Sequence, residues 1–384
     1  MKKIKYLSYY AETENPQNRN IALAATNKID YICDAIIHAG YEVNIISASG
    51  TRDRKKCYRG SRIKLKEGKY LKTFFSFPWG NKLQKGLNII ASNIGVLNEL
   101  LKTKKDEKVI VYHSLGYMRL INLIHKLKRF HLVLEVEEIY ADVIGNENLR
   151  KKEIKFLSSA ESYIFPTKLL DSLINVKNKP AVVIHGTYQV ESERECRNKT
   201  NNLQNEMGRI IHCVYAGTFD PRKGGAIAAA AAAEYLPSNY HIHILGFGNE
   251  KDVKNIKQTI DKIAKKSCAK LTYDGMLSGE EYIRFIQSCD IGLSTQEPTA
   301  AFNATSFPSK ILSYLANGLR VVSIRIPAIE NSDIGKTLYY YNEQSPEQIA
   351  KAILKININD TYDSRELIRR LSEKFEKNIK WLLE

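Results

Sequence analysis

The apolar residues of this chain follow two spacings that alternate along it. Short apolar runs predict buried strands, and apolar residues three and four positions apart predict amphipathic helices. In the first half the predicted strands are Ile4–Tyr10, Glu42–Ser47, Tyr70–Phe75, Lys108–Tyr112, His131–Glu135, Ser162–Phe165 and Ala181–Ile184. The predicted helices between them are Ile21–Ala39, Leu87–Leu101 and Tyr117–Lys128. This alternation predicts an α/β protein with a doubly wound parallel sheet.

The same alternation resumes after a polar segment, residues 189–209. Strands are predicted at residues 210–217, 240–248, 269–275, 290–295 and 319–324, and helices at Gly225–Tyr235, Lys251–Ala264, Glu280–Gln287 and Ser309–Ala316. We therefore expect two Rossmann-like domains in tandem. The expected bounds are residues 1–190, a linker at 191–208, a second domain at 209–362, and a final helix at 363–384 that packs back toward the first domain.

Composition places the chain among folded proteins without a membrane span. Of its 384 residues 43% are hydrophobic and 26% are charged, and no apolar run reaches the length of about 18 residues that spans a bilayer. The start of the chain is basic but lacks the apolar core of a signal peptide, which predicts a cytoplasmic location. The six cysteines form no CxxC pair. His241 and His243 share one predicted strand face, and two isolated ligands are interpreted as structural residues, so no metal site is expected.

The net charge of +16 requires a partner or another explanation. Basic residues are dense between Arg52 and Lys72, where the alternatives are a solvated loop and a site for an anionic membrane surface or a phosphate-bearing substrate. No nucleic-acid-binding motif accompanies them, so nucleic acid is not an expected partner. An anionic surface would place the protein peripherally at the inner membrane face. The oligomeric state does not follow from the sequence.

The segment "GTFDPRKGG" lies between a predicted strand and an alanine-rich predicted helix. The alternative is an alanine-rich linker or an ordinary buried helix. Gly224 and its neighbour allow close backbone approach, the alanines allow tight packing on the sheet, and Lys223 stands just before the free amides of the helix start. A lysine beside such amides is a phosphate-binding arrangement. The spacing is neither a Walker loop nor GxGxxG.

A second helix start has similar chemistry. In "FNATSFPSKILSYLANGLRVVS", Pro308 suits the first helical turn, Ser306 lies just outside it, and Ser309 and Lys310 lie within it. Both starts follow carboxyl ends of predicted strands, where open α/β sheets bind ligands. We expect Lys223 and Lys310 to bind one diphosphate. The alternative for Lys310 is that it is an ordinary solvated residue of the helix.

These motifs, in order, resemble the GT-B fold glycosyltransferases, specifically the retaining group known as family four. The resemblance also rests on "GFG" at 246–248 and "YDGMLSGEEY" at 273–282, and it covers residues 209–358 well. It implies two Rossmann-like domains facing a cleft. It implies a nucleotide-sugar site that we assign to Gly217, Thr218, Lys223, Gly224, Gly246, Gly275, Asn303, Ser306, Ser309 and Lys310.

The chain departs from the family pattern at three positions. Thr218 replaces an arginine, and Thr305 and Ser313 replace two glutamates of the sugar- and ribose-binding region. Recognition of the ribose by a carboxylate is therefore in doubt, and we interpret the chain as a divergent branch.

In the family, the first domain binds the acceptor. His113 ends one predicted strand, and the acidic run that includes Glu137 and Glu138 ends the next. Carboxylates after an apolar strand are costly to bury, so we expect them to face the cleft, where Glu137 or Glu138 could polarise the acceptor hydroxyl. An ordinary acidic loop is the alternative.

The expected function is transfer of a hexose from a nucleotide diphosphate sugar to a saccharide or lipid-linked saccharide, in surface polysaccharide or glycan synthesis. The resemblance implies retention of configuration and favours a UDP-linked donor. No Asp-x-Asp occurs in the chain, so a metal-independent site without a cofactor is expected. The alternatives are a sugar-nucleotide epimerase of GT-B fold and a non-catalytic GT-B partner subunit of a glycosyltransferase.

Overall fold

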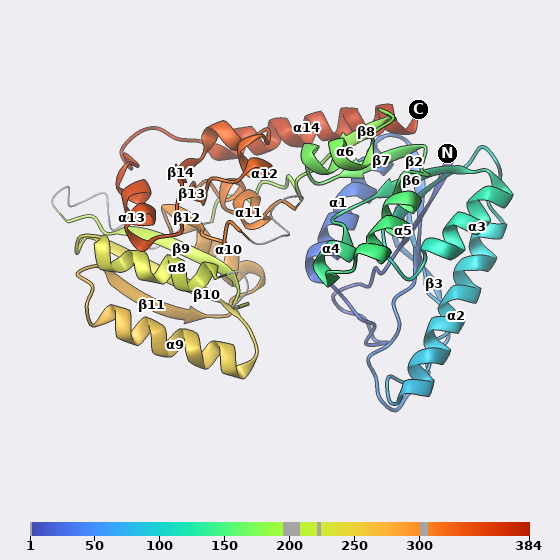
Figure 1. The fold of residues 1–384 in the computed structure, drawn as a ribbon, viewed down its shortest axis with the longest axis horizontal. Helices are drawn as coiled ribbons and strands as arrows, with labels where there is room; N and C mark the ends of the chain where they lie inside the picture. Colours follow the sequence, from blue (N-terminus) through green and yellow to red (C-terminus); the bar gives the residue numbers. More distant parts are fainter. Residues whose placement is uncertain (1, 195–207, 221–223, 300–305) are drawn as a thin grey trace. The chain divides into compact units, whose positions relative to one another are not determined.

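The computed structural model describes residues 2–194, 208–220, 224–299 and 306–384 (Figure 1). The chain forms two compact units, unit 1 with Met1–Thr187 and Glu373–Glu384, and unit 2 with Tyr188–Ser372. The unit boundary precedes the linker expected at 191–208, most of which lies outside the described residues. The assignment of acceptor and donor roles to separate domains stays a prediction.

Unit 1 contains a sheet of eight strands within the described residues, in the order β3-β4-β2-β1-β5-β6-β7-β8. Its strands are β1 (Lys2–Ser8), β2 (Tyr41–Ser47), β3 (Arg62–Lys66), β4 (Lys69–Lys72), β5 (Lys108–Tyr112), β6 (His131–Glu135), β7 (Ser162–Phe165) and β8 (Ala181–Val183). All neighbours are parallel except β3 and β4, which are antiparallel. The predicted α/β doubly wound class is confirmed for this unit.

The helices of unit 1 connect these parallel strands. They are α1 (Leu23–His38), α2 (Lys82–Leu101), α3 (Met118–Lys128), α4 (Tyr140–Ile144), α5 (Glu147–Leu157) and α6 (Lys168–Ile174). One hydrophobic core joins β-strand residues such as Val109 and Leu132 to Val96 of α2, Ile121 of α3 and Phe156 of α5. This core fixes the strand ends from which the polar residues of the unit project.

Unit 2 contains a fully parallel sheet of six described strands, in the order β11-β10-β9-β12-β13-β14. Its strands are β9 (Ile211–Thr218), β10 (Tyr240–Phe247), β11 (Lys270–Gly275), β12 (Ile291–Ser294), β13 (Arg320–Ile324) and β14 (Tyr339–Tyr341). The order reverses between β9 and β12, which is the point where such sheets bind ligands.

The helices of unit 2 include one shorter than the sequence predicts. They are α8 (Gly225–Ala231), α9 (Glu250–Ala264), α10 (Gly279–Gln287), α11 (Lys310–Ala316), α12 (Pro327–Glu330) and α13 (Pro346–Leu354), with 3-10 turns η2 (Ala232–Tyr235) and η4 (Gly335–Thr337). The predicted helix at 225–235 is thus α-helical only to Ala231.

The last helix, α14 (Ser364–Leu383), contributes residues to both units. Its end packs in unit 1, where Phe375 stacks on Tyr31 of α1 at 5.5 Å between ring centroids. The Tyr41 hydroxyl donates a 2.7 Å hydrogen bond to the carbonyl of Leu383. Within the described ranges, no helix has the length and apolar character that crossing a bilayer requires.

The basic segment from Arg52 to Lys72 is not one solvated loop. Its second half is the β3–β4 hairpin at the sheet edge, so the strand predicted at Tyr70–Phe75 is displaced toward the amino terminus. The lysines of this half have acidic partners, in the pairs Lys64–Glu67, Lys66–Asp34, Lys69–Asp30 and Lys72–Glu99. Most of the exposed basic residues therefore lie in the first half, at Arg52, Arg54, Lys55, Lys56 and Arg59.

Candidate functional site

The carboxyl ends of β9 and β10 in unit 2 meet without side chains between them. Gly246 pairs with Gly217 and has φ +150°, a conformation that L side chains rarely adopt. A Cβ atom on Gly246 would lie 1.8 Å from the carbonyl oxygen of Gly217. Only glycine fits there, and at Gly217 and Gly246 the strands contribute bare backbone, with the Phe219 ring beside Gly246.

Lys310 brings a positive charge to this bare edge. A Cβ atom on Gly217 would lie 2.9 Å from the Lys310 ammonium nitrogen, Nζ. The same nitrogen lies 3.8 Å from the centroid of the Tyr215 ring, a cation–π contact that holds the lysine over β9. Gly217 and Lys310, both assigned to the donor site from the sequence, are thus neighbours in the structure.

The start of α8 packs closely against the same strand. Gly224 has φ +60°, and a Cβ atom on Gly225 would lie 2.9 Å from the Tyr215 ring and 3.2 Å from the carbonyl oxygen of Thr295. The hydroxyl of Thr295 donates to the carbonyl of Gly225 at 2.7 Å. Glycine is therefore needed for this packing, whatever binds at the helix start.

Several sequence-assigned donor residues lie elsewhere or outside the described ranges. Lys223, Asn303 and Thr305 are outside, so the convergence of Lys223 with Lys310 stays a prediction. Ser306 is half-buried, and Ser309 is exposed immediately before α11, which begins one residue later than predicted.

A cavity of about 200 Å³ opens beside Gly217 and Gly246. Met276, Leu277 and Tyr282 line its other side. Gly275, at the end of β11, has φ +84° and open space around it. Thr218 lies apart from this cavity and lines a separate groove with Phe219 and Asp252.

The sequence analysis missed Tyr282, whose hydroxyl lies 3.2 Å from the hydroxyl oxygen of Ser313. Ser313 stands where the family resemblance implies a glutamate. A tyrosine–serine hydroxyl pair therefore lies beside the cavity in place of that carboxylate. The signal was present in "GEEY" at 279–282, but no spacing rule relates that tyrosine to Ser313 before the fold is known.

The acidic run at the end of β6 divides into buried and half-buried carboxylates. Glu135 is 0% exposed and accepts a hydrogen bond from the Tyr6 hydroxyl. Burial, together with the charge of Glu137, raises the pKa of Glu135 to about 8, so it holds a proton at neutral pH. A strongly shifted carboxyl group is a marker of functional sites, and the site assignment from the sequence left it out.

Glu137 and Glu138, the predicted acceptor-activating pair, are both half-buried. Lys28 of α1 donates to Glu137 at 2.6 Å, and the Lys28 side chain is itself buried. Glu137 is therefore held in place by a cation and keeps part of its surface accessible. Whether either residue acts on an acceptor stays a prediction.

His113, the third predicted catalytic residue, is buried and hydrogen-bonded to Glu153. Its Nε2 lies 2.7 Å from Glu153 Oε1, and Glu153 also accepts backbone hydrogen bonds from Tyr140 and Ala141. Burial would raise the pKa of Glu153, but its bonds with His113 and these amides lower the pKa overall. With 1% of its surface exposed, His113 is better suited to positioning this loop than to touching a substrate.

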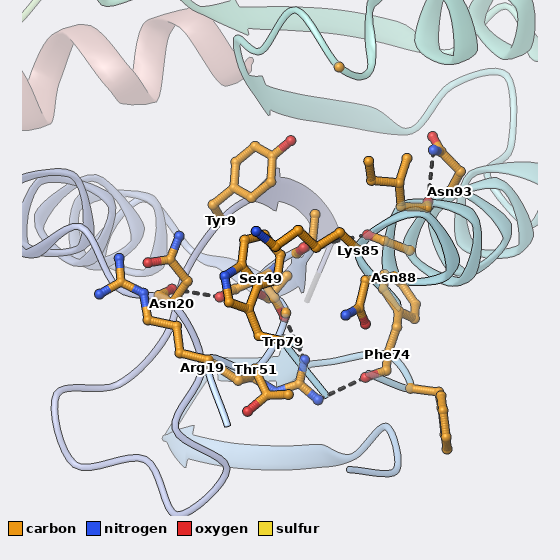
Figure 2. Close-up of a pocket in the computed structure, with 18 of the residues that line it drawn as sticks. Tyr9, Arg19, Asn20, Ser49, Thr51, Phe74, Trp79, Lys85, Asn88 and Asn93 are labelled. Carbon is orange, nitrogen blue, oxygen red and sulfur yellow. Dashed lines mark hydrogen bonds between the residues drawn. The ribbon is translucent and has the colours of Figure 1, made fainter. Parts of the chain in front are cut away.

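Unit 1 also contains a cavity of about 570 Å³ that the sequence analysis did not assign (Figure 2). Loops after β1, β2 and β4 form one side of it, and helix α2 forms another. Trp79 lies at its centre in Figure 2, with Lys85 beside the indole ring at 4.8 Å and Tyr9 across from it. Polar side chains of Asn20, Asn88 and Asn93 also line the cavity.

Arg19 is the charged group built into this cavity. It is 4% exposed, and its guanidinium donates to the backbone carbonyls of Ser49 at 2.5 Å and Phe74 at 2.7 Å and to the side chain of Gln17 at 2.7 Å. Among the described residues, no carboxylate pairs with it. Burial lowers the pKa of Arg19 to about 10, so the group remains charged at neutral pH. A buried cation with neutral partners favours an anion in the adjacent space.

Unit 2 matches a known protein family in sequence, and the chain matches known proteins in fold. Residues 211–359 match the family model described as glycosyl transferases group 1. No sequence among curated proteins matches the chain.

Solved structures match over nearly the whole chain. An E. coli structure described as trehalose-6-phosphate bound with UDP-2-fluoro glucose has a TM-score of 0.69 at 12% identity, covering 99% of this chain and 97% of that one. The sucrose-phosphate synthase of Thermosynechococcus elongatus has a TM-score of 0.68 at 12% identity, covering 100% and 95%. The α,α-trehalose 6-phosphate synthase of Burkholderia multivorans has a TM-score of 0.62 at 10% identity, covering 100% and 95%.

At these identities the structural likeness concerns the fold, and the family match concerns unit 2. The two lines of evidence agree with the bare strand ends and the lysine at the carboxyl edge of β9. The chain has the GT-B fold of glycosyltransferases, and its residues 211–359 match the glycosyl transferases group 1 family.

Proposed function

We propose that the protein transfers a hexose from a nucleotide diphosphate sugar, UDP-linked, to a saccharide acceptor that carries an anionic group. The observation that carries the proposal is the position of Lys310 Nζ beside Gly217, at the edge of the cavity that Gly246 and Tyr282 line. Lys310 thus places a positive charge beside the backbone of Gly217, within the residues that match the group 1 family. A fluorinated UDP-glucose is bound in the E. coli relative by fold, which supports UDP as the nucleotide.

In the proposed donor site Lys310 contacts the diphosphate. During transfer, the bond between the anomeric carbon and the phosphate oxygen breaks, and its electron pair leaves with the diphosphate. A fixed ammonium group stabilises that developing charge. Lys223, where it reaches the same diphosphate, adds a second cation. No metal bridge is part of the proposal, because the chain has no Asp-x-Asp.

The ribose of the nucleotide is assigned to the hydroxyl pair of Tyr282 and Ser313. A ribose hydroxyl can both donate and accept, as can each of these two side chains. The pair replaces a carboxylate and leaves the donor site less negative next to the diphosphate. Retention of the anomeric configuration is part of the proposal and rests on the family resemblance.

We assign activation of the acceptor hydroxyl to Glu137, with Glu138 as its neighbour. The hydroxyl oxygen forms the new bond to the anomeric carbon, and its proton passes to a base. The 2.6 Å hydrogen bond that Lys28 donates supports one fixed orientation of Glu137. His113 serves as a positioning residue for the loop that follows this acidic run, through Glu153.

The acceptor is assigned to the cavity around Arg19 and Trp79. Aromatic side chains such as Trp79 and Tyr9 stack on sugar faces, and Arg19 favours a phosphate or carboxylate on the sugar. Two of the relatives by fold are named as synthases of phosphorylated sugars, which supports an anionic acceptor.

A lipid-linked acceptor at an anionic membrane is our specific version of this proposal. Beside the cavity, α2 exposes an apolar stripe of Leu83, Ile90 and Ile94. The exposed basic residues at 52–59 lie in the loop that contributes Arg52 to the cavity wall. Apolar side chains flanked by cations suit an anionic lipid surface, which would place the protein at the inner face of the membrane in glycan synthesis.

The full chain is incubated with UDP-glucose under three conditions. These are no acceptor, glucose 6-phosphate as a probe acceptor, and a lipid-linked saccharide as a second acceptor. We expect UDP release that depends on an acceptor and a glycosylated product by mass spectrometry. An epimerised donor without acceptor would indicate the epimerase alternative. Donor binding without product under all acceptor conditions, or no donor binding, would contradict transfer by this chain alone.

A further inference from the structure

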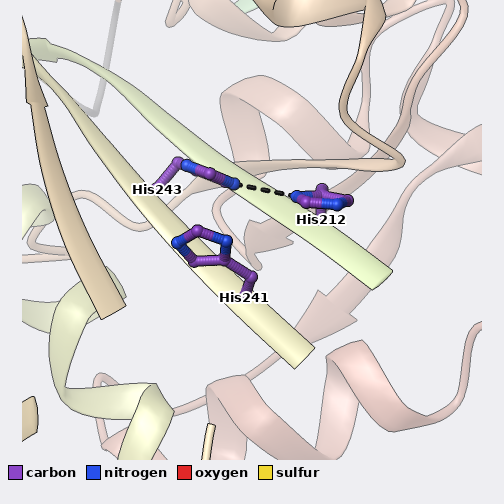
Figure 3. Close-up of side chains that lie close together, drawn as sticks. All are labelled: His212, His241 and His243. Atoms are coloured by element: carbon purple, nitrogen blue, oxygen red, sulfur yellow. Dashed lines mark hydrogen bonds between the residues drawn. The ribbon is translucent and has the colours of Figure 1, made fainter. Parts of the chain in front are cut away.

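Three histidines lie side by side on one face of the unit 2 sheet (Figure 3). His212 is on β9, and His241 and His243 are on the neighbouring β10. His212 is the register partner of His241, and His243 follows two residues later on the same face. The sequence analysis interpreted His241 and His243 as isolated, because it did not place His212 next to them.

The ring nitrogens of these histidines converge. One nitrogen from each ring lies within 4.8 Å of the other two. Nδ1 of His212 and Nε2 of His243 are 2.9 Å apart, and the rings of His241 and His243 have centroids 3.7 Å apart. Ligands of a tetrahedral zinc ion stand about 3.3 Å from one another, given bonds of about 2.0–2.1 Å. Small side-chain rotations would bring the three nitrogens to that spacing.

Neighbouring polar and aromatic side chains orient the ring of His243. Nδ1 of His243 lies 3.2 Å from the carboxylate of Asp274, which also accepts a 2.9 Å bond from the Thr272 hydroxyl. A carboxylate on the far nitrogen of a histidine fixes the tautomer in metal sites. Phe285 of α10 packs edge-on against His243 at 5.1 Å.

Access and local charge also suit a cation. His241 and His243 are each 7% exposed, whereas His212 is half-buried and gives solvent a path to the cluster. Asp290, the other nearby carboxylate, is paired with Arg209 at 2.7 Å and with the His212 amide at 2.9 Å. Lys270 is the register partner of His241 on the neighbouring strand and is exposed. Asp274 remains as the carboxylate directed at the cluster.

We propose that His212, His241 and His243 bind one divalent zinc ion, with Asp274 as the carboxylate behind His243. Three imidazole nitrogens are a ligand set that suits zinc, and they leave a fourth position for water. The site joins β9 to β10 and would stabilise unit 2 when metal is bound.

This zinc site is separate from the proposed donor site. His212 lies five residues before Gly217 on β9, and His241 lies five before Gly246 on β10. At about 3.3 Å per residue, His212 and His241 lie about 16 Å from the donor edge, and His243, three residues before Gly246, lies about 10 Å from it. The metal is therefore not a bridge to the diphosphate, and the inference does not depend on the proposed function.

The test is calorimetric titration of zinc chloride into the untagged, metal-stripped full chain, followed by thermal melting with and without zinc. We expect saturable binding of one zinc ion per chain and a higher melting temperature with zinc. The His243→Gln and His212→Gln variants should each bind at least tenfold more weakly. Asp274→Asn should weaken binding by about 10- to 100-fold while leaving all three ligands in place.

His38→Gln is the matched control, because His38 is exposed on α1 of unit 1 and lies outside the cluster. It should bind zinc as the wild type does. Circular dichroism establishes that each variant is folded, and the more exposed His212 provides the variant least expected to disturb packing. Absence of saturable binding, or equal affinity in the wild type and both folded ligand variants, would overturn the proposal.

Discussion

Two buried ionisable residues distinguish unit 1. Arg19 is a buried cation without a carboxylate partner among the described residues, and Glu135 is a buried carboxyl group that holds a proton at neutral pH. The sequence places Arg19 in a loop after the first strand and Glu135 in the acidic run, but it does not predict their burial, because an isolated arginine or glutamate has no pattern until the fold is known. The sequence did indicate Gly217 and Lys310, whose glycine and lysine types fit the bare strand edge.

The raised pKa of Glu135 has a consequence for stability. Below about pH 4.5 the carboxyl group is protonated in the folded and unfolded states, whereas between there and about pH 8 only the folded state keeps the proton. The free energy of unfolding should therefore fall as the pH rises through this window, by at most about 1.4 kcal/mol per pH unit from this group. Glu135→Gln should remove that contribution.

Urea unfolding of the wild type and Glu135→Gln at several pH values between 4.5 and 8 measures the difference. The exposed Glu343→Gln in unit 2 is the control and should follow the wild type. A wild-type advantage that does not shrink toward pH 8 would show that Glu135 is ionised in the folded protein.

At the scale of elements, the alternation of strands and helices and the parallel arrangement were predictable, whereas the strand order and several boundaries were not. Alternating apolar runs and amphipathic segments predicted both sheets, because each pattern follows directly from the side that an element buries. The β3–β4 hairpin was missed because charged residues dominate it, and its stability comes from pairs with distant acids such as Asp34 and Glu99. The early end of α8 was missed because an alanine run has no stop signal at Ala231.

The contact between β9 and β10 at Gly246 leads to a prediction about the donor edge. Gly246→Ala would place a methyl group on the Gly217 carbonyl in a backbone conformation that costs about 1–3 kcal/mol for a side chain. We expect a lower melting temperature and weaker donor binding, because the strand ends must move apart.

The control for this variant is Gly86→Ala in α2, where a Cβ atom would meet nothing within 4 Å. In a helix this change should be neutral or stabilising by about 0.4–1 kcal/mol. If Gly246→Ala melts and binds like the wild type, the bare-backbone description of the donor edge is incorrect.

At the scale of the whole molecule, the family assignment rests on unit 2 and the fold assignment on both units. The ordered motifs from "GTFDPRKGG" to "PSKILSYLANG" were sufficient to indicate a GT-B glycosyltransferase from the sequence. The cavity around Arg19 and Trp79 could not be indicated in this way, because its walls come from loops and a helix that are far apart in the chain. The three-histidine cluster was hidden for the same reason, since His212 and His243 are 31 positions apart.

The central claim, that the β9–β10 edge of unit 2 binds a nucleotide diphosphate sugar through Lys310, is tested most directly by calorimetric titration of UDP-glucose into the full chain. Wild type and Lys351→Ala, an exposed lysine paired with Glu347 on α13, should bind one equivalent with equal affinity. Lys310→Ala should bind about 10- to 150-fold more weakly, which corresponds to a loss of about 1.5–3 kcal/mol. Unchanged affinity in folded Lys310→Ala, or no binding of UDP-glucose, UDP or any other nucleotide diphosphate sugar to the wild type, would contradict the account.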